Sequence, residues 1–422
     1  MSPTSPSSSP SLFASRDFRL LLAGQTTSQL GAQVSGVAVP LLAVVTLGAS
    51  PFEVGLIGAA STLAFALIGL PAGAWIDRVR RRPVLIASDV VRALLLASIP
   101  LAALFGVLSV GQLLLVSLLT GFARVFFDVG YRSYLPSVIG RDRVLAGNSS
   151  LEFVRASGQV AGPALGGVLV TLTGAASVLL VQAGTFAASA LCLVGIRSRE
   201  ETPVASSRRG MRHDIGEGLR FVLRSRALRA TAIASALSNF SFAIASAVNM
   251  VFLSRTLGLP AALIGAVIAV GSVTVMIGAA FTTRLARAVG SARIVWLSLA
   301  VTAPLSLLGA FARPGWWTLL IVGGIAAGEL GQIVYAITSV SLRQQVCPDR
   351  MLGRVNATMQ VVVMGLFPVG AVIGGLLGDA IGARWTLVVA GGLLLVCPVL
   401  LRVALRGVRE VAELPEAVER AA

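Results

Sequence analysis

Residues 148–175 read NSSLEFVRASGQVAGPALGGVLVTLTGA, and residues 356–383, which lie 208 positions later, read NATMQVVVMGLFPVGAVIGGLLGDAIGA. Both stretches are apolar and carry glycine at the same places. Internal repeats of this kind are typical of membrane bundles that are built from two related halves. The repeat therefore predicts a duplicated helical membrane protein. Its shared positions are Asn148, Gly162, Gly166, Gly167, Gly174 and Ala175, which recur as Asn356, Gly370, Gly374, Gly375, Gly382 and Ala383.

The composition of the chain excludes most soluble classes. Hydrophobic residues make up 56% of the 422 residues and charged residues only 12%, whereas a soluble domain carries about 25% charged residues. Apolar runs of about 20 residues match a hydrocarbon core that is ~30 Å thick. We therefore expect an all-α integral membrane protein with twelve transmembrane helices in two six-helix pseudo-repeats. The expected spans are 18–47, 53–76, 83–107, 109–131, 145–171, 174–196, 228–254, 260–283, 291–311, 315–341, 353–380 and 383–404.

The polar segments between these spans divide the chain into parts. The stretch around residues 214–224 places Ile215, Leu219 and Val222 on one helical face, which predicts an amphipathic helix on the inner membrane surface. A plain linker helix is the alternative. The expected parts are a disordered cytoplasmic N-terminus (1–17), an N-terminal six-helix half (18–197), a cytoplasmic linker (198–226), a C-terminal six-helix half (227–405) and a cytoplasmic tail (406–422).

The net charge of +16 is distributed unevenly along the chain. Arginines gather in every second connection, and the other connections hold only Arg255, Arg313 and Arg384. Cytoplasmic loops of membrane proteins carry such an excess of basic residues. We therefore expect a multi-pass protein of the cytoplasmic membrane with both termini in the cytoplasm. The basic charge is thus explained by cytoplasmic loops, and nucleic acid is not an expected partner.

Residues that would support enzymatic or metal chemistry are sparse. The cysteines at 192, 347 and 397 form no C-x-x-C pair, and the single histidine, His213, stands apart from them. A zinc site needs three or four such ligands together. No G-x-x-x-x-G-K-[ST] loop and no nucleophile-base constellation are present. We expect no enzyme activity, no cofactor and no metal site.

Two motifs lie in the first half, one at the inner end of the second expected span and one within the fifth. The segment Gly73-Ala-Trp-Ile-Asp77-Arg78-Val-Arg80-Arg81-Arg82 resembles the loop 2–3 signature of the major facilitator superfamily, G-x-x-x-D-R-x-G-R-R, with Arg80 in place of the second glycine. The resemblance implies a conformational latch in which the Asp77 carboxylate accepts charge-assisted hydrogen bonds. A plain topology anchor is the alternative. The latch residues would be Gly73, Asp77, Arg78, Arg81 and Arg82.

The second motif, Gly158-Gln-Val-Ala-Gly162-Pro163-Ala-Leu-Gly166-Gly167, is similar to the antiporter motif G-x-x-x-G-P-x-x-G-G of the same superfamily. Missing side chains let helices approach closely, and Pro163 removes a backbone donor and bends the helix. Ordinary small-residue packing is the alternative. The resemblance covers nearly the whole chain and is greatest to the drug/proton antiporter branch that includes macrolide-efflux and enterobactin-exporter proteins.

This resemblance implies proton-coupled export of amphipathic small molecules, such as drugs, antibiotics or siderophores, by alternating access. The expected partners are a small-molecule substrate, protons and the lipid bilayer, and we expect a monomer. Two alternatives stay open. One is a carrier of the same fold for metabolite uptake or facilitated diffusion, and the other is a membrane receptor or assembly partner that does not transport. A continuous central cavity would favour a transporter.

Polar side chains mark where such a cavity is expected. Gln25, Gln29 and Gln33 recur every four residues and form one stripe on an otherwise apolar span. In the superfamily that the chain resembles, spans one, four, seven and ten line the cavity, so Asn239 and Asn249 of span seven are expected to face this stripe. Hydrogen bonding between packed helices is the alternative.

Charged residues within the spans are costly and need a partner or a wet cavity. Three pairs stand at helical neighbour spacing, which favours mutual neutralisation; Arg124 in the second pair is also a candidate for substrate contact. The pairs are Asp89 with Arg92, Arg124 with Asp128, and Glu152 with Arg155.

Glu329 differs because no basic residue lies within four positions of it. A carboxyl that is buried without a cation favours its protonated form, so Glu329 is the candidate for proton coupling. A permanently protonated or hydrogen-bonded structural glutamate is the alternative. Gln332, one turn further along the span, is a candidate for the cavity wall.

Overall fold

The computed structural model describes residues 12–76, 78–140, 143–198, 200 and 211–414. Helices dominate this part of the chain, which contains no strand. The principal helices are α1 (Arg16–Leu41), α2 (Pro51–Ile76), α3 (Arg81–Leu104), α4 (Val110–Ile139), α5 (Val144–Thr173), α6 (Ala175–Gly195), α7 (Met211–Arg224), α8 (Arg226–Val251), α9 (Ala261–Val289), α10 (Arg293–Leu307), α11 (Leu319–Val346) and α12 (Asp349–Ala404).

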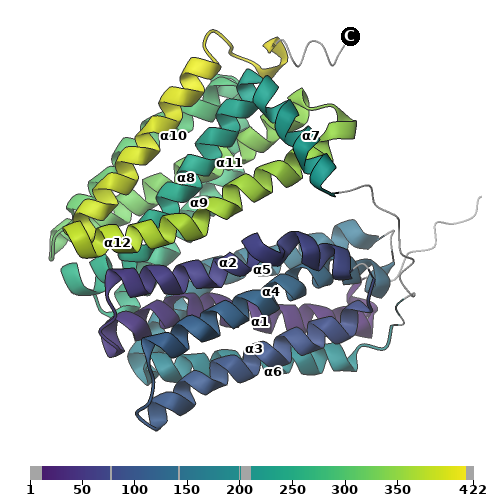
Figure 1. Cartoon of the computed structure of the whole chain (residues 1–422), viewed down its shortest axis with the longest axis vertical. Coiled ribbons are helices and arrows are strands. Elements are labelled where there is room, and N and C mark those ends of the chain that lie inside the picture. The colour runs from purple at the N-terminus through teal and green to yellow at the C-terminus, as the bar shows by residue number, and fades with distance from the viewer. Residues whose placement is uncertain (1–11, 77, 141–142, 199, 201–210, 415–422) are drawn as a thin grey trace, which may run out of the picture.

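The helices form two bundles, as the sequence repeat predicts. Figure 1 shows α1–α6 gathered in one bundle and α8–α12 in the other, with α7 at one end of the second bundle. By length and composition, ten helices in the described residues can cross a membrane. Helix α5 is not among these ten, and α12 is counted once although it bends sharply. If α5 and each arm of α12 also cross the membrane, the spans number the twelve expected; length and composition alone support ten spans in the described residues.

The two bundles repeat the same break at the same place. Gly174, between α5 and α6, has φ 81° and ψ 154°. Gly382, within α12, has φ 81° and ψ 158°. This backbone conformation is easily adopted only by glycine. Each bundle therefore turns back on itself at the glycine that the sequence repeat singles out.

Glycines also join the two bundles. A Cβ atom on Gly167 of α5 would lie 3.0 Å from the Cα of Gly265 of α9, and a Cβ atom on Gly55 of α2 would lie 3.1 Å from the Cα of Gly375 of α12. Such distances leave no room for a side chain, so backbone packs directly on backbone. Both contacts lie at the end of the molecule where α2 and α9 begin, which we call the closed end.

Hydrogen bonds reinforce the closed end. The Arg255 guanidinium donates to the carbonyl oxygens of Val44, at 2.8 Å, and Ala49, at 2.9 Å, in the other bundle. The Ala262 amide donates to Thr171 Oγ1 across the α5–α9 contact, at 3.1 Å. In the described part of the chain, the hydrogen bonds between the two bundles all lie at this end.

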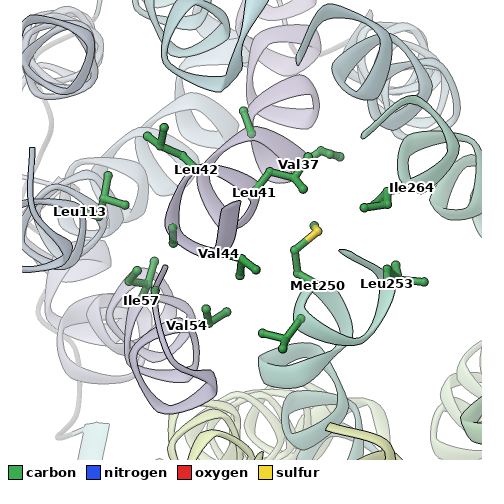
Figure 2. Packing of buried hydrophobic residues seen from close by; sticks show 14 of the residues in the cluster. Val37, Leu41, Leu42, Val44, Val54, Ile57, Leu113, Met250, Leu253 and Ile264 are labelled. Atoms are coloured by element: carbon green, nitrogen blue, oxygen red, sulfur yellow. The ribbon is translucent and has the colours of Figure 1, made fainter. Parts of the chain in front are cut away.

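An apolar plug fills the closed end. Figure 2 shows side chains of both bundles that point toward one another, with Val37, Leu41 and Val44 on one side and Met250 and Leu253 on the other. All five are buried. Burial of apolar surface is the main favourable term in such packing, so the plug separates one end of the molecule from the space between the bundles.

Several helices run past their expected ends. Helix α4 continues to Ile139 and α9 to Val289, beyond the expected limits at residues 131 and 283. The expected span limits were placed where the apolar residues end. The helices continue further, because their backbone hydrogen bonds do not depend on apolar side chains. Residues 1–11, 77, 141–142, 199, 201–210 and 415–422 lie outside the described residues.

Helix α7 corresponds to the amphipathic helix expected in the linker. Its Val222 side chain is buried in the core of the second bundle, whereas Leu219 and Leu223 are exposed. The Arg354 guanidinium of α12 donates to the Glu217 carboxylate of α7 at 2.6 Å. Helix α7 is therefore attached to protein along part of its apolar face, which the expectation of a helix lying on the membrane did not include.

The glycine contact between α5 and α9 leads to a first testable prediction. Replacement of Gly167 by valine should push α5 and α9 apart, because the opposing atoms belong to the backbone and cannot move aside cheaply. Gly184→Val is the matched control, since a Cβ atom there would meet nothing within 4 Å. Spin labels at Leu104 and Phe311, in a background without native cysteines, should report a longer distance across the closed end for Gly167→Val. Unchanged distances in both variants would contradict the prediction.

Candidate functional site

A cavity of about 1420 Å³ lies between the plug and the opposite end of the molecule. This volume exceeds the 300–1,000 Å³ that is typical of small-molecule sites. Ala43, Ala247 and Met250 line it near the plug, and Ser149 and Phe153 line it far from the plug. The cavity therefore extends along α1, α4 and α5 away from the closed end, toward what we call the open end.

The structure brings together most of the residues expected at a cavity. The glutamine stripe of α1 faces it along its whole length, which agrees with the four-residue spacing of the stripe. Asn239, Gln332 and Glu329 are not among the lining residues. The expected residues that do line the cavity are Gln25, Gln29, Gln33, Arg124, Asp128 and Asn249.

Polar residues of the second bundle bond to one another. Gln332 Nε2 of α11 donates to Ser238 Oγ of α8. The Tyr335 hydroxyl donates to the carbonyl oxygen of Thr231 at 3.0 Å and lies 2.8 Å from Ser235 Oγ. These bonds join α8 to α11 in the manner of interhelical hydrogen bonds in membrane bundles. The position of Gln332 is thus explained by packing within the second bundle.

Glu329 lies on α11 and is half-buried. It faces α9, because a Cβ atom on Gly271 of α9 would lie 3.3 Å from Glu329 Cγ. In the described part of the chain, no hydrogen bond or ion pair to its carboxylate is recorded. The Glu329 carboxyl therefore stands inside the second bundle and outside the cavity wall.

The three charge pairs form as their spacing predicts, but they differ in burial. Arg92 and Asp89 of α3 make a buried ion pair, with side-chain exposures of 6% and 0%. In the pair of Arg124 with Asp128, 3.4 Å apart, the side chains are 71% and 42% exposed. The pair of Arg155 with Glu152 is exposed to a similar degree. Only the first pair belongs to the protein core.

Two aromatic rings hold Arg92 in place. The centre of its guanidinium lies 4.3 Å from the Phe127 ring of α4 and 4.2 Å from the Phe186 ring of α6. A cation over an aromatic face gains electrostatic stabilisation, more so when it is desolvated. Arg92, Phe127 and Phe186 all line the cavity. This clamp has no signature in the sequence, because no local spacing indicates that two distant phenylalanines meet around one arginine.

The Gly/Pro motif of α5 packs against two partners. A Cβ atom on Gly166 would lie 3.1 Å from the Cα of Val34 on α1, while one on Gly162 would meet Gln33. Gly167 and the Pro163 carbonyl face α9 of the other bundle, and Gly158 lies near Gln33 with more room. The motif therefore places α5 between α1 and the second bundle, where it joins the cavity wall to the closed end.

The loop 2–3 motif is described only in part. Asp77 lies outside the described residues, and Gly73 and Arg78 lie at the end of α2 and just beyond it. Arg82 Nε donates to the Leu193 carbonyl oxygen of α6 at 2.9 Å. The amides of Arg81 and Arg82 donate to the Glu200 carboxylate at 3.0 and 3.2 Å. A carboxylate at a helix N-terminus satisfies free amides there, so Glu200 ties the start of the linker to α3.

A corresponding contact occurs in the second bundle. The Glu410 carboxylate accepts hydrogen bonds from the hydroxyl and the amide of Ser291, just before α10. The Ser291 hydroxyl and then its amide hold the pKa of Glu410 below its usual range. Neither Glu200 nor Glu410 was singled out from the sequence, although both stand 210 positions apart, close to the spacing of the internal repeat.

Comparisons with known proteins agree with this architecture. Residues 7–419 match the family model of transmembrane secretion effectors, a branch of the major facilitator superfamily. The chain therefore belongs to this family, and it is a membrane transporter by family and fold rather than an enzyme. It is 28% identical to the multidrug efflux pump Tap of Mycolicibacterium fortuitum, over 87% of this chain and 90% of Tap. It is 27% identical to the enterobactin exporter EntS of Escherichia coli, over 95% and 94% of the two chains.

A solved structure shares the fold at lower identity. A bacterial homologue of the iron transporter ferroportin in its inward-facing state has a TM-score of 0.75 and 17% identity, over 92% of this chain and 98% of the homologue. The outward-facing state of a bacterial homologue of the same transporter has a TM-score of 0.60. The arrangement of the two bundles is thus more similar to the inward-facing one.

The buried ion pair of α3 leads to a second testable prediction. Replacement of Asp89 by asparagine leaves the Arg92 charge in the core without its partner, which typically costs about 3–5 kcal/mol. The double variant Asp89→Asn/Arg92→Gln should recover much of this loss, because it removes both charges. Thermal unfolding of the purified protein in detergent measures both effects.

Glu152→Gln is the control for this experiment, because exposed ion pairs contribute only about 0–1 kcal/mol and the Glu152–Arg155 pair is exposed. Equal thermal shifts in the Asp89 and Glu152 variants would contradict a special role of the buried pair.

Proposed function

We propose that this chain is a proton-coupled exporter of amphipathic small molecules that works by alternating access in the cytoplasmic membrane. The observation that carries the proposal is a large cavity that is closed at one end by glycine contacts and an apolar plug. The curated relatives Tap and EntS, which carry the names of a multidrug efflux pump and a siderophore exporter, support export as the direction.

The proposed orientation places the open end in the cytoplasm. The arginine-rich connections, among them Arg78–Arg82 and the linker, lie at the ends of helices that point away from the plug. The excess of basic residues in cytoplasmic loops then assigns this end to the inside. In this orientation the described state is inward-open and ready to take up a molecule from the cytoplasm or the inner leaflet.

Proton coupling rests on Glu329 as the candidate carboxyl. The side chain is half-buried, lies between α11 and α9, and has no recorded partner in the described residues. A carboxyl in such a place changes its proton occupancy when the surrounding helices move and its exposure to water changes. Because Glu329 lies outside the cavity wall, coupling would act through the position of α11 and α9 rather than through contact with the substrate.

Export and uptake are distinguished by a panel of candidate substrates. Cells with the protein should accumulate less of an exported compound than cells without it, and a protonophore should abolish the difference. Higher accumulation in cells with the protein would favour the uptake carrier. No difference in accumulation for any amphipathic compound would favour a receptor or assembly role. Such a role does not need a large cavity.

The proposed role of Glu329 leads to a third testable prediction. Glu329→Gln keeps the size and hydrogen bonding of the side chain but cannot release a proton, so gradient-driven export should fall at least about tenfold while the protein still folds and binds substrate. Asp379→Asn, an exposed acidic position on α12, is the control and should retain export. The readout is transport into inverted vesicles with an imposed pH gradient. Export at the parental rate by the Glu329→Gln protein would rule out this carboxyl as the coupling group.

A further inference from the structure

A second hollow of the molecule is a groove of about 440 Å³ between α7, α8 and the arm of α12 that precedes Gly382. It is separate from the central cavity, because the two share no lining residue. Of the described side chains that line the groove, only those of Arg229 and Thr358 are polar. The Thr358 hydroxyl donates to the Arg354 carbonyl oxygen at 2.9 Å, so Arg229 is the charged group that a ligand in the groove would meet.

The groove lies on the outer face of the second bundle. Leu237 and Ile233 of α8 line the groove, whereas Ser246 and Asn249 of the same helix line the central cavity. Ser246 follows Leu237 by about two and a half helical turns, and Asn249 follows Ile233 by about four and a half turns. The groove and the cavity therefore lie on opposite faces of α8. In a membrane-spanning bundle, the face away from the central cavity adjoins lipid.

The groove is charged at one end and apolar along the rest of its length. Arg229 lies near the start of α8, and Phe240 marks the other end of the groove on this helix. At the rise of an α-helix, these two residues are separated by about 16 Å. This length is about half of a hydrocarbon core that is ~30 Å thick. The groove thus has the depth and the polarity of one leaflet, with a charged group at the interface and apolar side chains below it.

Four arginines gather around the charged end. Arg220 and Arg224 belong to α7, and Arg226 and Arg229 belong to the first turns of α8. All four are exposed, and no acidic residue occurs in the segment 218–229. In the described residues, none of the four takes part in an ion pair. Basic clusters on an amphipathic helix or beside a membrane span are typical of sites for anionic lipid headgroups.

Arg229 joins the charged end to the apolar part. Its Nη1 atom donates to the Leu223 carbonyl oxygen of α7 at 3.0 Å. This bond uses one of several guanidinium N–H donors, and the planar fork of such donors matches the geometry of a phosphate. The side chains of Leu223 and Ile233, which also line the groove, are 51% and 49% exposed. An acyl chain in the groove would cover both.

We propose that this groove binds an anionic phospholipid, with its phosphate at Arg229 and an acyl chain along Ile233 and Leu237. Arg220 and Arg224 add the positive potential that favours an anionic headgroup over a zwitterionic one. The bound lipid bridges α7, α8 and α12, and so holds the linker helix on the second bundle. In the proposed orientation the lipid belongs to the inner leaflet. The site requires a bilayer and does not depend on export.

Native mass spectrometry of the full chain, purified in detergent and titrated with lipid, tests this site. The probes are dioleoyl phosphatidylglycerol, which is anionic, and dioleoyl phosphatidylcholine, which has the same chains and no net charge. The parent protein should bind phosphatidylglycerol at least about fivefold more tightly, the effect of about one arginine near a membrane surface. Glycerol phosphate, which has no acyl chain, should not compete at equal concentration.

Variants of Arg229 test the charged end. Arg229→Gln should raise the Kd for phosphatidylglycerol about fivefold, whereas Arg229→Lys keeps the charge and should retain most of the affinity. Arg19→Gln is the matched control and should bind with the parental Kd. Arg19 is exposed near the start of α1, stands 210 positions before Arg229, and does not line the groove.

A variant of Ile233 tests the apolar part. Ile233→Trp places a bulky side chain in the groove and should weaken the binding of both lipids, because the acyl chain loses its place. Val301→Trp is the control, since Val301 of α10 is 56% exposed and does not line the groove. Thermal unfolding of each variant verifies that it is folded.

Several results would overturn the lipid site. Equal affinity of the parent for the two lipids would indicate unselective lipid contact, and effective competition by glycerol phosphate would indicate an anion site without a lipid. Parental affinity in Arg229→Gln or in Ile233→Trp would remove the groove as the place of binding. A dimeric mass in place of a lipid-bound monomer would assign the groove to a second copy of the chain.

Failure of the proposed function has a different signature. A protein that binds phosphatidylglycerol through Arg229 and Ile233 but exports no compound of the panel would retain the lipid site and lose the exporter.

Discussion

The contact of backbone on backbone at the closed end is the constraint on which the rest of the structure depends. Gly167 with Gly265 and Gly55 with Gly375 bring two pairs of helices together without side chains between them. This closeness lets the apolar plug exclude water and leaves the cavity open on one side only. Contacts between small residues rely on dispersion, which is weak per atom. Such a contact contains no charged group, so its separation leaves no buried charge without a partner.

The two bundles share a scaffold but differ in chemistry. The second bundle satisfies its polar groups internally, as Gln332 does with Ser238 and Tyr335 does with Thr231. The first bundle lines the cavity with the glutamine stripe of α1 and holds Arg92 between two rings. Duplication thus explains the shape of the molecule, while divergence after duplication explains why the two bundles carry different polar groups.

Local spacing was a good guide to the face of a helix and a poor guide to its neighbours. The glutamine stripe of α1 lines the cavity because residues four apart share a helical face. The same argument paired Asp89 with Arg92, yet gave no sign that this pair alone is buried. Burial depends on Phe127 and Phe186, which approach Arg92 from α4 and α6. Likewise Glu329 has no cation nearby in sequence, and only packing placed it toward Gly271 of α9, away from the cavity.

The sequence by itself determined the membrane class, the duplication and the turning points at Gly174 and Gly382, because apolar run length and the need for glycine at positive φ are properties of short segments. Tertiary structure alone decided which end of the molecule is closed and which charge pair is buried. It also decided that Glu200 accepts hydrogen bonds from the first amides of α3 and that Glu410 accepts hydrogen bonds from Ser291, just before α10. The physical reason is that these features depend on distances between segments far apart in the chain, and packing of the two bundles sets those distances.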